Sequence, residues 1–166
     1  MDSETGGIVY LTPMPGQDEL VRENDERLIG LGDSAACVKG PLSQDQISSI
    51  FSFHPSVHFV SVVNEDGTLL DSVKRAGLNP LEPPEETRKS MERWAAARST
   101  LSGSDRFLGS MKTIIVRREK LVELLFPMPN FLIVIGVHPA FPLDKASQLE
   151  KLLNKLEVGG DEWRWA

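Results

Sequence analysis

The sequence predicts an α+β domain built on a single five-stranded antiparallel sheet with flanking helices, in the order αββαβββα. Strand-like runs rich in β-branched and aromatic residues form one group of two and one group of three, with helix-like stretches before, between and after them. The links within each group are short, so neighbouring strands must run antiparallel. The helix between the two groups must cross the sheet, which makes one continuous sheet the economical solution.

The first predicted helix covers residues 43–53. Ser43 is a suitable N-cap, and Gln46 follows it at the spacing of a capping box. Apolar residues share one face of this stretch: Ile47, Ile50 and Phe51. A strand–turn–strand pattern follows, with strands at 57–63 and 68–73. The turn between them, 64–67, has the sequence Asn-Glu-Asp-Gly, with glycine where a positive φ is needed. The pattern predicts a β-hairpin.

A second, longer helix is predicted from Leu81 to about Leu101. Two prolines stand in its first turn, and two glutamates follow near the positive end of the helix dipole. The spacing of its apolar residues predicts a buried stripe made of Met91, Trp94, Ala95 and Leu101.

Three extended runs then follow, at 106–116, 121–126 and 131–137. The last of these is apolar without alternation, which predicts a central strand covered on both faces. The final helix is predicted over 143–156. Its apolar side is formed by Ala146, Leu149, Leu152, Leu153 and Leu156.

The chain divides into three parts by composition. Residues 1–40 contain eight acidic and three basic residues with many Gly and Pro, which predicts an acidic extension that is flexible or loosely docked. Such an extension is either a functional arm or a tail without a role. Residues 41–158 form the domain itself. Residues 159–166 form an aromatic C-terminal tail that includes Trp163 and Trp165.

The overall composition excludes several classes of protein. The net charge of -6, from 18 basic and 24 acidic residues, argues against a sequence-independent nucleic-acid binder. The single cysteine, Cys37, excludes an internal disulfide and multi-cysteine metal sites. No apolar stretch is long enough to span a membrane, and the N-terminus lacks a signal-peptide pattern. We therefore expect a protein of the cytoplasm.

The order of elements is similar to that of roadblock (dynein light chain) and longin domains, and more loosely to profilin, PAS and GAF domains. The hairpin sequence Val-His-Phe-Val-Ser-Val-Val-Asn-Glu-Asp-Gly-Thr-Leu-Leu at 57–70 resembles the first hairpin of an uncharacterised group of archaeal roadblock-like proteins. The resemblance covers residues 43–156, and the paired prolines at the start of the second helix depart from it. It implies a homodimeric or partner-binding platform without catalytic residues.

The sequence carries no enzyme signature. It has no Gly-x-Ser-x-Gly, no phosphate-binding loop and no dinucleotide fingerprint, and Cys37 has no adjacent base. A metal site would require His54, His58 and His138 or carboxylates to converge. The stronger interpretation is that these are ordinary histidines of loops and strand ends. We therefore expect no catalytic residues, no cofactor and no metal.

The functional prediction is an interaction or adaptor module that binds a second copy of the chain or another protein. The run 106–116 is the longest of its group and is expected to form an exposed edge strand. The interface candidates are Arg106, Lys112, Ile114, Val116, Trp163 and Trp165. In a competing account, residues 8–11 add a strand to this edge within the chain. The alternative function is a PAS- or GAF-like sensor with a small-molecule ligand between the sheet and the helices.

Overall fold

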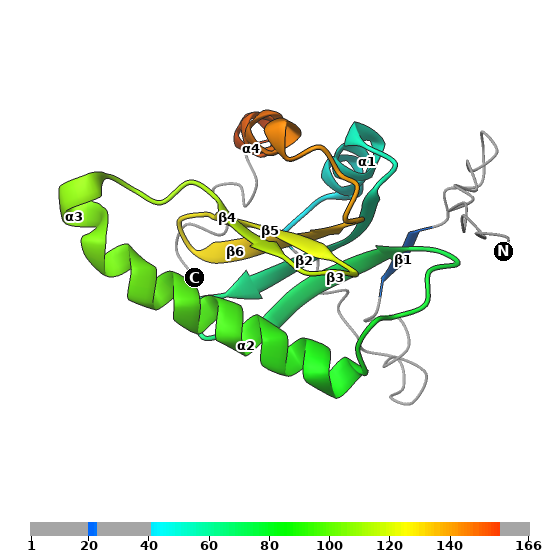
Figure 1. The fold of residues 1–166 in the computed structure, drawn as a ribbon, viewed down its shortest axis with the longest axis horizontal. Coiled ribbons are helices and arrows are strands. Elements are labelled where there is room, and N and C mark those ends of the chain that lie inside the picture. Colours follow the sequence, from blue (N-terminus) through cyan, green and yellow to red (C-terminus); the bar gives the residue numbers. More distant parts are fainter. Residues whose placement is uncertain (1–19, 23–40, 157–166) are drawn as a thin grey trace, which may run out of the picture.

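The structure, a computed structural model, describes residues 20–22 and 41–156. One antiparallel sheet runs through it in the strand order β1-β3-β2-β6-β5-β4 (Figure 1). The strands are β1 (Leu20–Arg22), β2 (Val57–Asn64), β3 (Leu69–Arg75), β4 (Ile114–Arg117), β5 (Val122–Pro127) and β6 (Phe131–Val137). The α-helices are α1 (Gln44–Phe53), α2 (Pro84–Leu101), α3 (Asp105–Leu108) and α4 (Ala146–Lys155), with the 3₁₀ helices η2 (Ser102–Ser104) and η3 (Leu143–Lys145).

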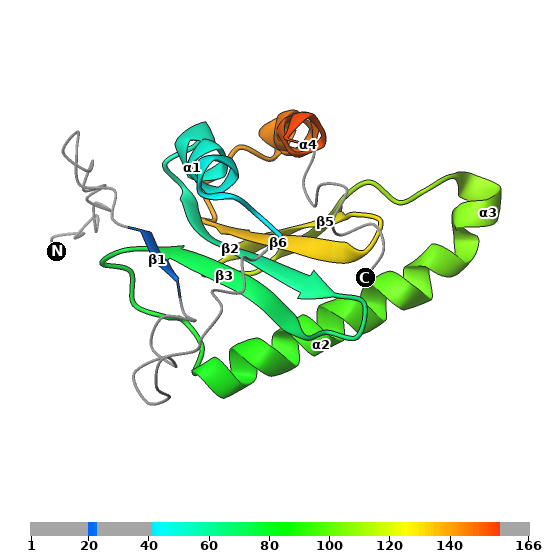
Figure 2. The same ribbon diagram turned by 180° about the vertical axis from the view of Figure 1, so that it is seen from behind.

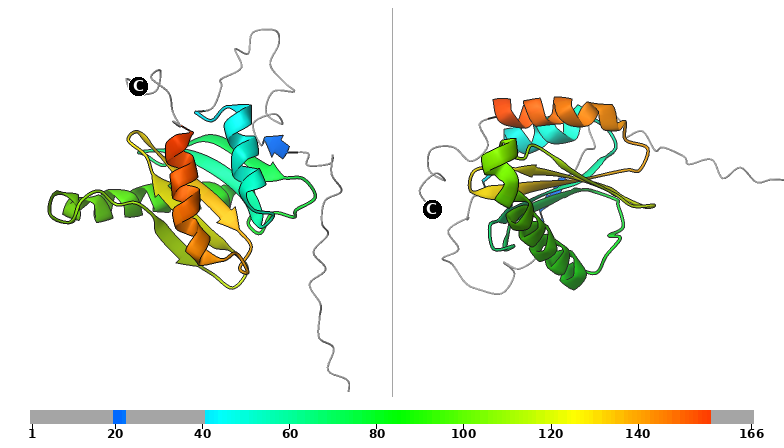
Figure 3. Two further views of the ribbon diagram at one scale, coloured as in Figure 1. Left: turned by 90° about the horizontal axis from the view of Figure 1, so that it is seen from above. Right: turned by 60° about the vertical axis from the view of Figure 1, so that its left-hand side comes forward.

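The predicted five-stranded antiparallel sheet is confirmed as β2 to β6, and β1 adds a short sixth strand beside β3. Helices α1 and α4 cover one face of the sheet, and α2 crosses the other face (Figures 1 and 2). The three layers are seen edge-on in the right-hand view of Figure 3, and the left-hand view shows α1 beside α4.

The core is divided by the sheet into two clusters of buried residues. The larger cluster lies between the sheet and α1 and α4, and includes Ile47, Ile133 and Leu149. The smaller cluster lies under α2 and consists of Val63, Met91, Leu125, Leu132 and Val134. Strand β6 contributes side chains to both clusters, and all seven of its residues are buried. The prediction that 131–137 is the central strand is therefore confirmed.

The start of α1 forms as predicted. The Ser43 hydroxyl accepts a hydrogen bond from the Gln46 amide at 3.2 Å, and the Gln46 side-chain oxygen accepts one from the Ser43 amide at 2.7 Å. This capping box satisfies two amides that would otherwise lack a partner within the helix.

Replacing Ser43 with Ala should lower the free energy of unfolding by about 1 kcal/mol, because the Gln46 amide loses its acceptor at the first turn. Urea unfolding followed by circular dichroism measures the difference. Ser48→Ala is the matched control, since Ser48 is exposed within the same helix and Ala is the better helix former. Equal midpoints for the two variants would mean that the cap contributes nothing.

Two boundaries after α2 differ from the prediction. Leu101 is 51% exposed and does not belong to the buried stripe, which Met91 and Ala95 form with Trp94 half-buried beside them. The run 106–116 is not one strand, because η2 and α3 continue the helical path of α2 and only Ile114–Arg117 is extended. The positive φ of 85° at Gly109 ends α3, where the Gly109 amide donates to the Asp105 carbonyl.

The N-terminal strand β1 joins the sheet at an edge for which the sequence predicts no partner strand. Residues Leu20–Arg22 pair antiparallel with β3, opposite Val73–Arg75. This is the far end of the sheet from β4. The strand predicted at 8–11 lies outside the described residues. That 1–40 is a separate extension and 159–166 a separate tail stays a prediction.

Candidate functional site

Strand β4 is an edge of the sheet. It pairs with β5 alone among the described residues, whereas β3 has β1 on one side and β2 on the other. An edge strand presents a row of backbone amides and carbonyls to its surroundings, which makes it the natural place for another strand to pair. The predicted edge is therefore present, although it is four residues long.

The side chains of β4 alternate between the two faces of the sheet. Ile114 and Val116 point to the α2 face, where both are partly buried against the smaller cluster. Ile115 points to the other face and is 42% exposed. Thus the predicted interface residues Ile114 and Val116 pack against the core at this edge of the sheet. The exposed apolar residue of the strand is Ile115. The period-2 alternation of strands is the signal that identifies it, once the strand start is known.

The helical end that precedes β4 is apolar and exposed. Phe107 is 74% exposed and Leu108 is 84% exposed, both on α3. Arg106 lies on this helix and places its guanidinium 4.4 Å from the centre of the Phe107 ring. Lys112 lies in the five-residue link between α3 and β4. The remaining interface candidates, Trp163 and Trp165, are outside the described residues.

The β4–β5 hairpin tip carries a basic group that contacts α2. The Arg118 guanidinium lies 6.0 Å from the Trp94 ring centre and 3.5 Å from the Glu123 carboxylate. The Trp94 indole N–H donates to the same carboxylate at 3.1 Å. These contacts fix the tip against the helix, so Arg118 acts as a packing residue here.

Burial raises the pKa of the Glu123 carboxyl, and the negative charge of Glu82 adds to this effect. The hydrogen bond from Trp94 and the charge of Arg118 act in the opposite direction without cancelling it. Because the pKa is higher in the folded than in the unfolded protein, the folded state binds more protons between the two pKa values. The free energy of unfolding therefore falls as the pH rises through this interval, which begins near 4.5.

Replacing Glu123 with Gln should remove this decrease in the free energy of unfolding with rising pH. The amide keeps an oxygen acceptor for the Trp94 indole but carries no charge to desolvate, so the variant gains stability relative to the parent as the pH rises from the ordinary glutamate pKa to neutrality. Unfolding midpoints measured across that range give the difference. Glu119→Gln, at the exposed hairpin tip, is the control for the loss of one negative charge. A constant difference for Glu123→Gln would contradict the raised pKa.

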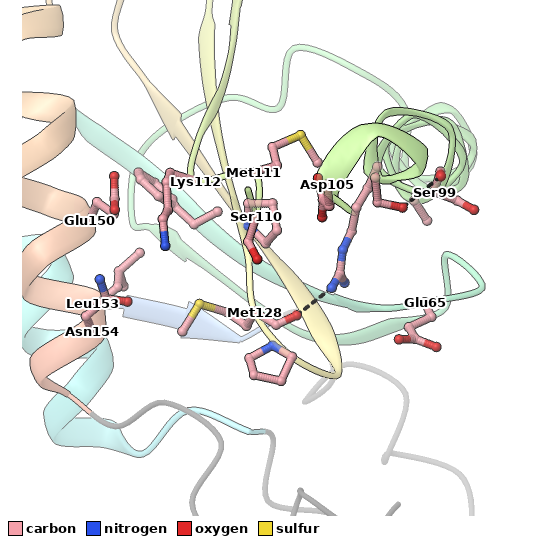
Figure 4. A pocket seen from close by; sticks show the side chains of 16 residues that line it. Glu65, Ser99, Asp105, Ser110, Met111, Lys112, Met128, Glu150, Leu153 and Asn154 are labelled. Atoms are coloured by element: carbon pink, nitrogen blue, oxygen red, sulfur yellow. Dashed lines mark hydrogen bonds between the residues drawn. The ribbon is translucent and has the colours of Figure 1, made fainter. Parts of the chain in front are cut away.

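A cavity of about 530 Å³ lies between the end of α2, the link before β4, the β5–β6 turn and α4. Figure 4 shows Lys112, Glu150 and Leu153 on its α4 side, Ser99 and Asp105 on the side of α2 and α3, and Met128 between them. The wall near α4 is fixed by the Thr113 hydroxyl, which donates to the Glu150 carboxylate at 3.2 Å. We call this space the α2–α4 cavity.

Arg98 is one of the cations in the wall of the α2–α4 cavity. One terminal nitrogen, Nη2, donates to the Met128 carbonyl at 2.5 Å (dashed line in Figure 4). The other, Nη1, is buried and has no hydrogen-bond acceptor within the part of the chain that the structure describes. A buried guanidinium nitrogen is costly without an acceptor, so this position favours an oxygen-bearing or aromatic group in the cavity.

A second, smaller cavity of about 240 Å³ lies under the first half of α2. Its polar groups include the Ser61 and Ser72 hydroxyls, which are hydrogen-bonded to each other at 3.0 Å, and the Glu123 carboxyl. His58 lies at its margin.

The histidines do not assemble a metal site in the described residues. His58 and His138 meet edge to face with ring centres 5.9 Å apart, and the pKa of His58 is lowered by burial, by His138 and by Arg75. Within 20–22 and 41–156, no group of three or more His, Cys, Asp or Glu side chains is placed to hold a metal ion. Over the same residues, no helix is long and apolar enough to cross a membrane.

Known structures share the fold of this chain. The gliding protein MglB from Thermus thermophilus aligns with a TM-score of 0.52 at 13% identity, over 68% of this chain and 85% of that one. A Roadblock/LC7 domain from Streptomyces avermitilis aligns with a TM-score of 0.51 at 11% identity, over 69% and 90%. The roadblock-like fold predicted from the sequence is thereby confirmed. No protein-family model and no curated protein matches the sequence.

Proposed function

We propose that this chain is a non-enzymatic protein-interaction module whose β4 edge surface pairs with a second copy of the chain. The β4 edge surface consists of Ile114–Arg117 with the exposed side chains of Ile115, Phe107 and Leu108. The observation that carries the proposal is the position of β4, which has a strand neighbour on one side only among the described residues. The shared fold with a Roadblock/LC7 domain and MglB is consistent with it but shows the fold alone.

A second copy fits this edge better than an unrelated strand because the sequence of β4 is compatible with its own antiparallel image. A two-fold axis at Ile115 would bring the two Ile115 side chains together and place Arg117 opposite Thr113 of the other chain. The cation would then face a hydroxyl-bearing residue instead of another cation.

The test is the mass in solution of the full chain, measured by size-exclusion chromatography with light scattering. Ile115→Lys should weaken self-association by at least tenfold, about 1.4 kcal/mol, because the substitution sets two positive charges across the axis. Leu81→Lys is the matched control, since Leu81 is exposed just before the start of α2 and lies outside the β4 edge surface. A strict monomer at high micromolar concentration would remove the proposal.

The alternative function is a small-molecule sensor, and the α2–α4 cavity is the observation that favours it. Its volume of about 530 Å³ falls within the usual range of ligand pockets, about 300–1,000 Å³, whereas the 240 Å³ cavity under α2 falls below it. A sensor should retain a stoichiometric small molecule through purification. Native mass spectrometry of the full chain would detect the added mass.

A further inference from the structure

We propose that the segment 157–166 folds back and inserts the indole side chains of Trp163 and Trp165 into the α2–α4 cavity of the same chain. The inference concerns a different surface from the β4 edge. It does not depend on whether the chain self-associates. Four observations carry it: the position of the end of α4, the chemistry of the cavity wall, the charges at its rim and the unsatisfied nitrogen of Arg98.

The end of α4 forms part of the cavity. Leu153 and Asn154, in the last turn of the helix, line it directly. The Leu156 carbonyl accepts a hydrogen bond from the Gln46 side chain at 2.6 Å, which ties the end of α4 to α1. Trp163 follows Asn154 by nine residues, a reach of about 30 Å when extended, so the indoles need only a turn of the chain to enter. The pair Gly159-Gly160 supplies residues that adopt such a turn without strain.

The apolar part of the wall suits an indole ring. Met111 and Met128 both line the cavity, together with Phe126, Pro129 and Leu153. Thioether side chains adapt to the shape of a ring and make favourable sulfur–aromatic contacts. Two tryptophans left in water would keep a large apolar area exposed, whereas each buries about 150–250 Å² when packed. The wall and the segment therefore complement each other in size and polarity.

The segment and the cavity wall each carry charges of both signs. Asp161 and Glu162 directly precede Trp163 and would lie near Arg98 and Lys112 at the cavity wall. The wall also carries carboxylates, which come from Glu65, Asp105 and Glu150. The single cation of the segment, Arg164, lies between the two tryptophans and is available to these groups.

The Arg98 guanidinium can contact both an indole ring and a carboxylate of the segment. Its Nη1 atom is buried without an acceptor among the described residues, and Nη2 is already used by the Met128 carbonyl. An indole ring placed against the guanidinium plane gives a cation–π contact, and a carboxylate of the segment gives Nη1 an acceptor. The carboxylate contact removes the cost of leaving that nitrogen unpaired in a buried position.

The test uses methionine-methyl NMR on the full chain, because the cavity contains its own probes. Indole rings shift the resonances of nearby methyl groups, so the Met111 and Met128 methyls should move when Trp163→Ala/Trp165→Ala removes the rings. Met91 is the internal control, since it is buried in the separate cluster under α2 and its methyl should stay in place. Both substitutions lie outside the described residues, 20–22 and 41–156.

A second variant tests the charge match in the same spectra. Asp161→Asn/Glu162→Gln should move the Met111 and Met128 methyls part of the way towards their positions in the double tryptophan variant. The parent chain should show the same partial movement when salt is raised, since the charge attraction is then screened.

Three results would overturn the proposal. If the Met111 and Met128 methyls do not move in the double tryptophan variant, the indoles do not occupy the cavity. If the methyls of the parent move on dilution, the indoles come from another copy of the chain. If native mass spectrometry finds a retained small molecule that competes with the indoles, the cavity belongs to a ligand. Methyl positions that depend on the tryptophans and not on concentration support insertion within one chain.

Discussion

Replacing Ile133 with Asp is expected to leave the domain largely unfolded. Ile133 has no exposed surface and lies in the middle of β6, between Val62 of β2 and Phe126 of β5. Its side chain belongs to the cluster under α1 and α4, whose buried members are all apolar and offer no charge to pair with a carboxylate. Burying an unpaired charge and losing an apolar side chain together cost more than about 4–5 kcal/mol. That is most of the stability of a typical domain, about 5–15 kcal/mol.

Thermal unfolding followed by circular dichroism measures this effect. Ile133→Val is the matched control, because it removes one methylene without adding charge and should cost about 1 kcal/mol. If Ile133→Asp melted near the parent temperature, the strand would not occupy the centre of the sheet.

Gly67→Ala is expected to have the second largest effect, about 3 kcal/mol, from two separate causes. The φ angle of Gly67 is 92°, in a region that costs a residue with a Cβ about 1–2 kcal/mol. In addition, a Cβ at this position would lie 2.7 Å from the Cα of Glu92, so the β2–β3 turn touches the backbone of α2. The helix must move away to accept even one methyl group, which loosens the small cluster beneath it.

Gly77→Ala separates these two causes. Gly77 has a similar φ of 78°, but a Cβ there would meet no atom within 4 Å. It should therefore show the backbone cost alone, about 1–2 kcal/mol. The difference between the two variants, measured by urea unfolding, is the cost of displacing α2. Equal losses would mean that the turn and the helix are not in tight contact.

Locally determined features were predictable from the sequence. The capping box at Ser43, the turn that ends at Gly67 and the central strand 131–137 depend on residues close together in the chain, and all three form. The strand predicted at 106–116 was wrong over most of its length. Its residues have strand-like spacing, but the turns after Leu101 continue the helix until Gly109 stops it.

Features that join distant segments were not predictable in the same way. Gly136 interrupts the apolar run of β6 for no reason visible in the sequence. In the structure it lies opposite Phe59, whose ring occupies the place of a side chain, because a Cβ on Gly136 would overlap a carbon of that ring. The α2–α4 cavity likewise draws its walls from α2, the link before β4, the β5–β6 turn and α4. Such pairings follow from tertiary contacts, so periodicity and turn chemistry do not reveal them.

With the short strand β1 in place, both edges of the described sheet are short. At one end β4 is four residues long, and at the other β1 is three residues long and pairs with Val73–Arg75 of the seven-residue β3. Without β1, the longer strand β3 would be the second edge, and a long edge strand is a better template for pairing with another chain. Pairing of β4 with β4 about a two-fold axis would close a pair, whereas pairing of β4 with a different edge would extend into an open fibre. The three residues of β1 thus shorten the edge that such head-to-tail growth would use.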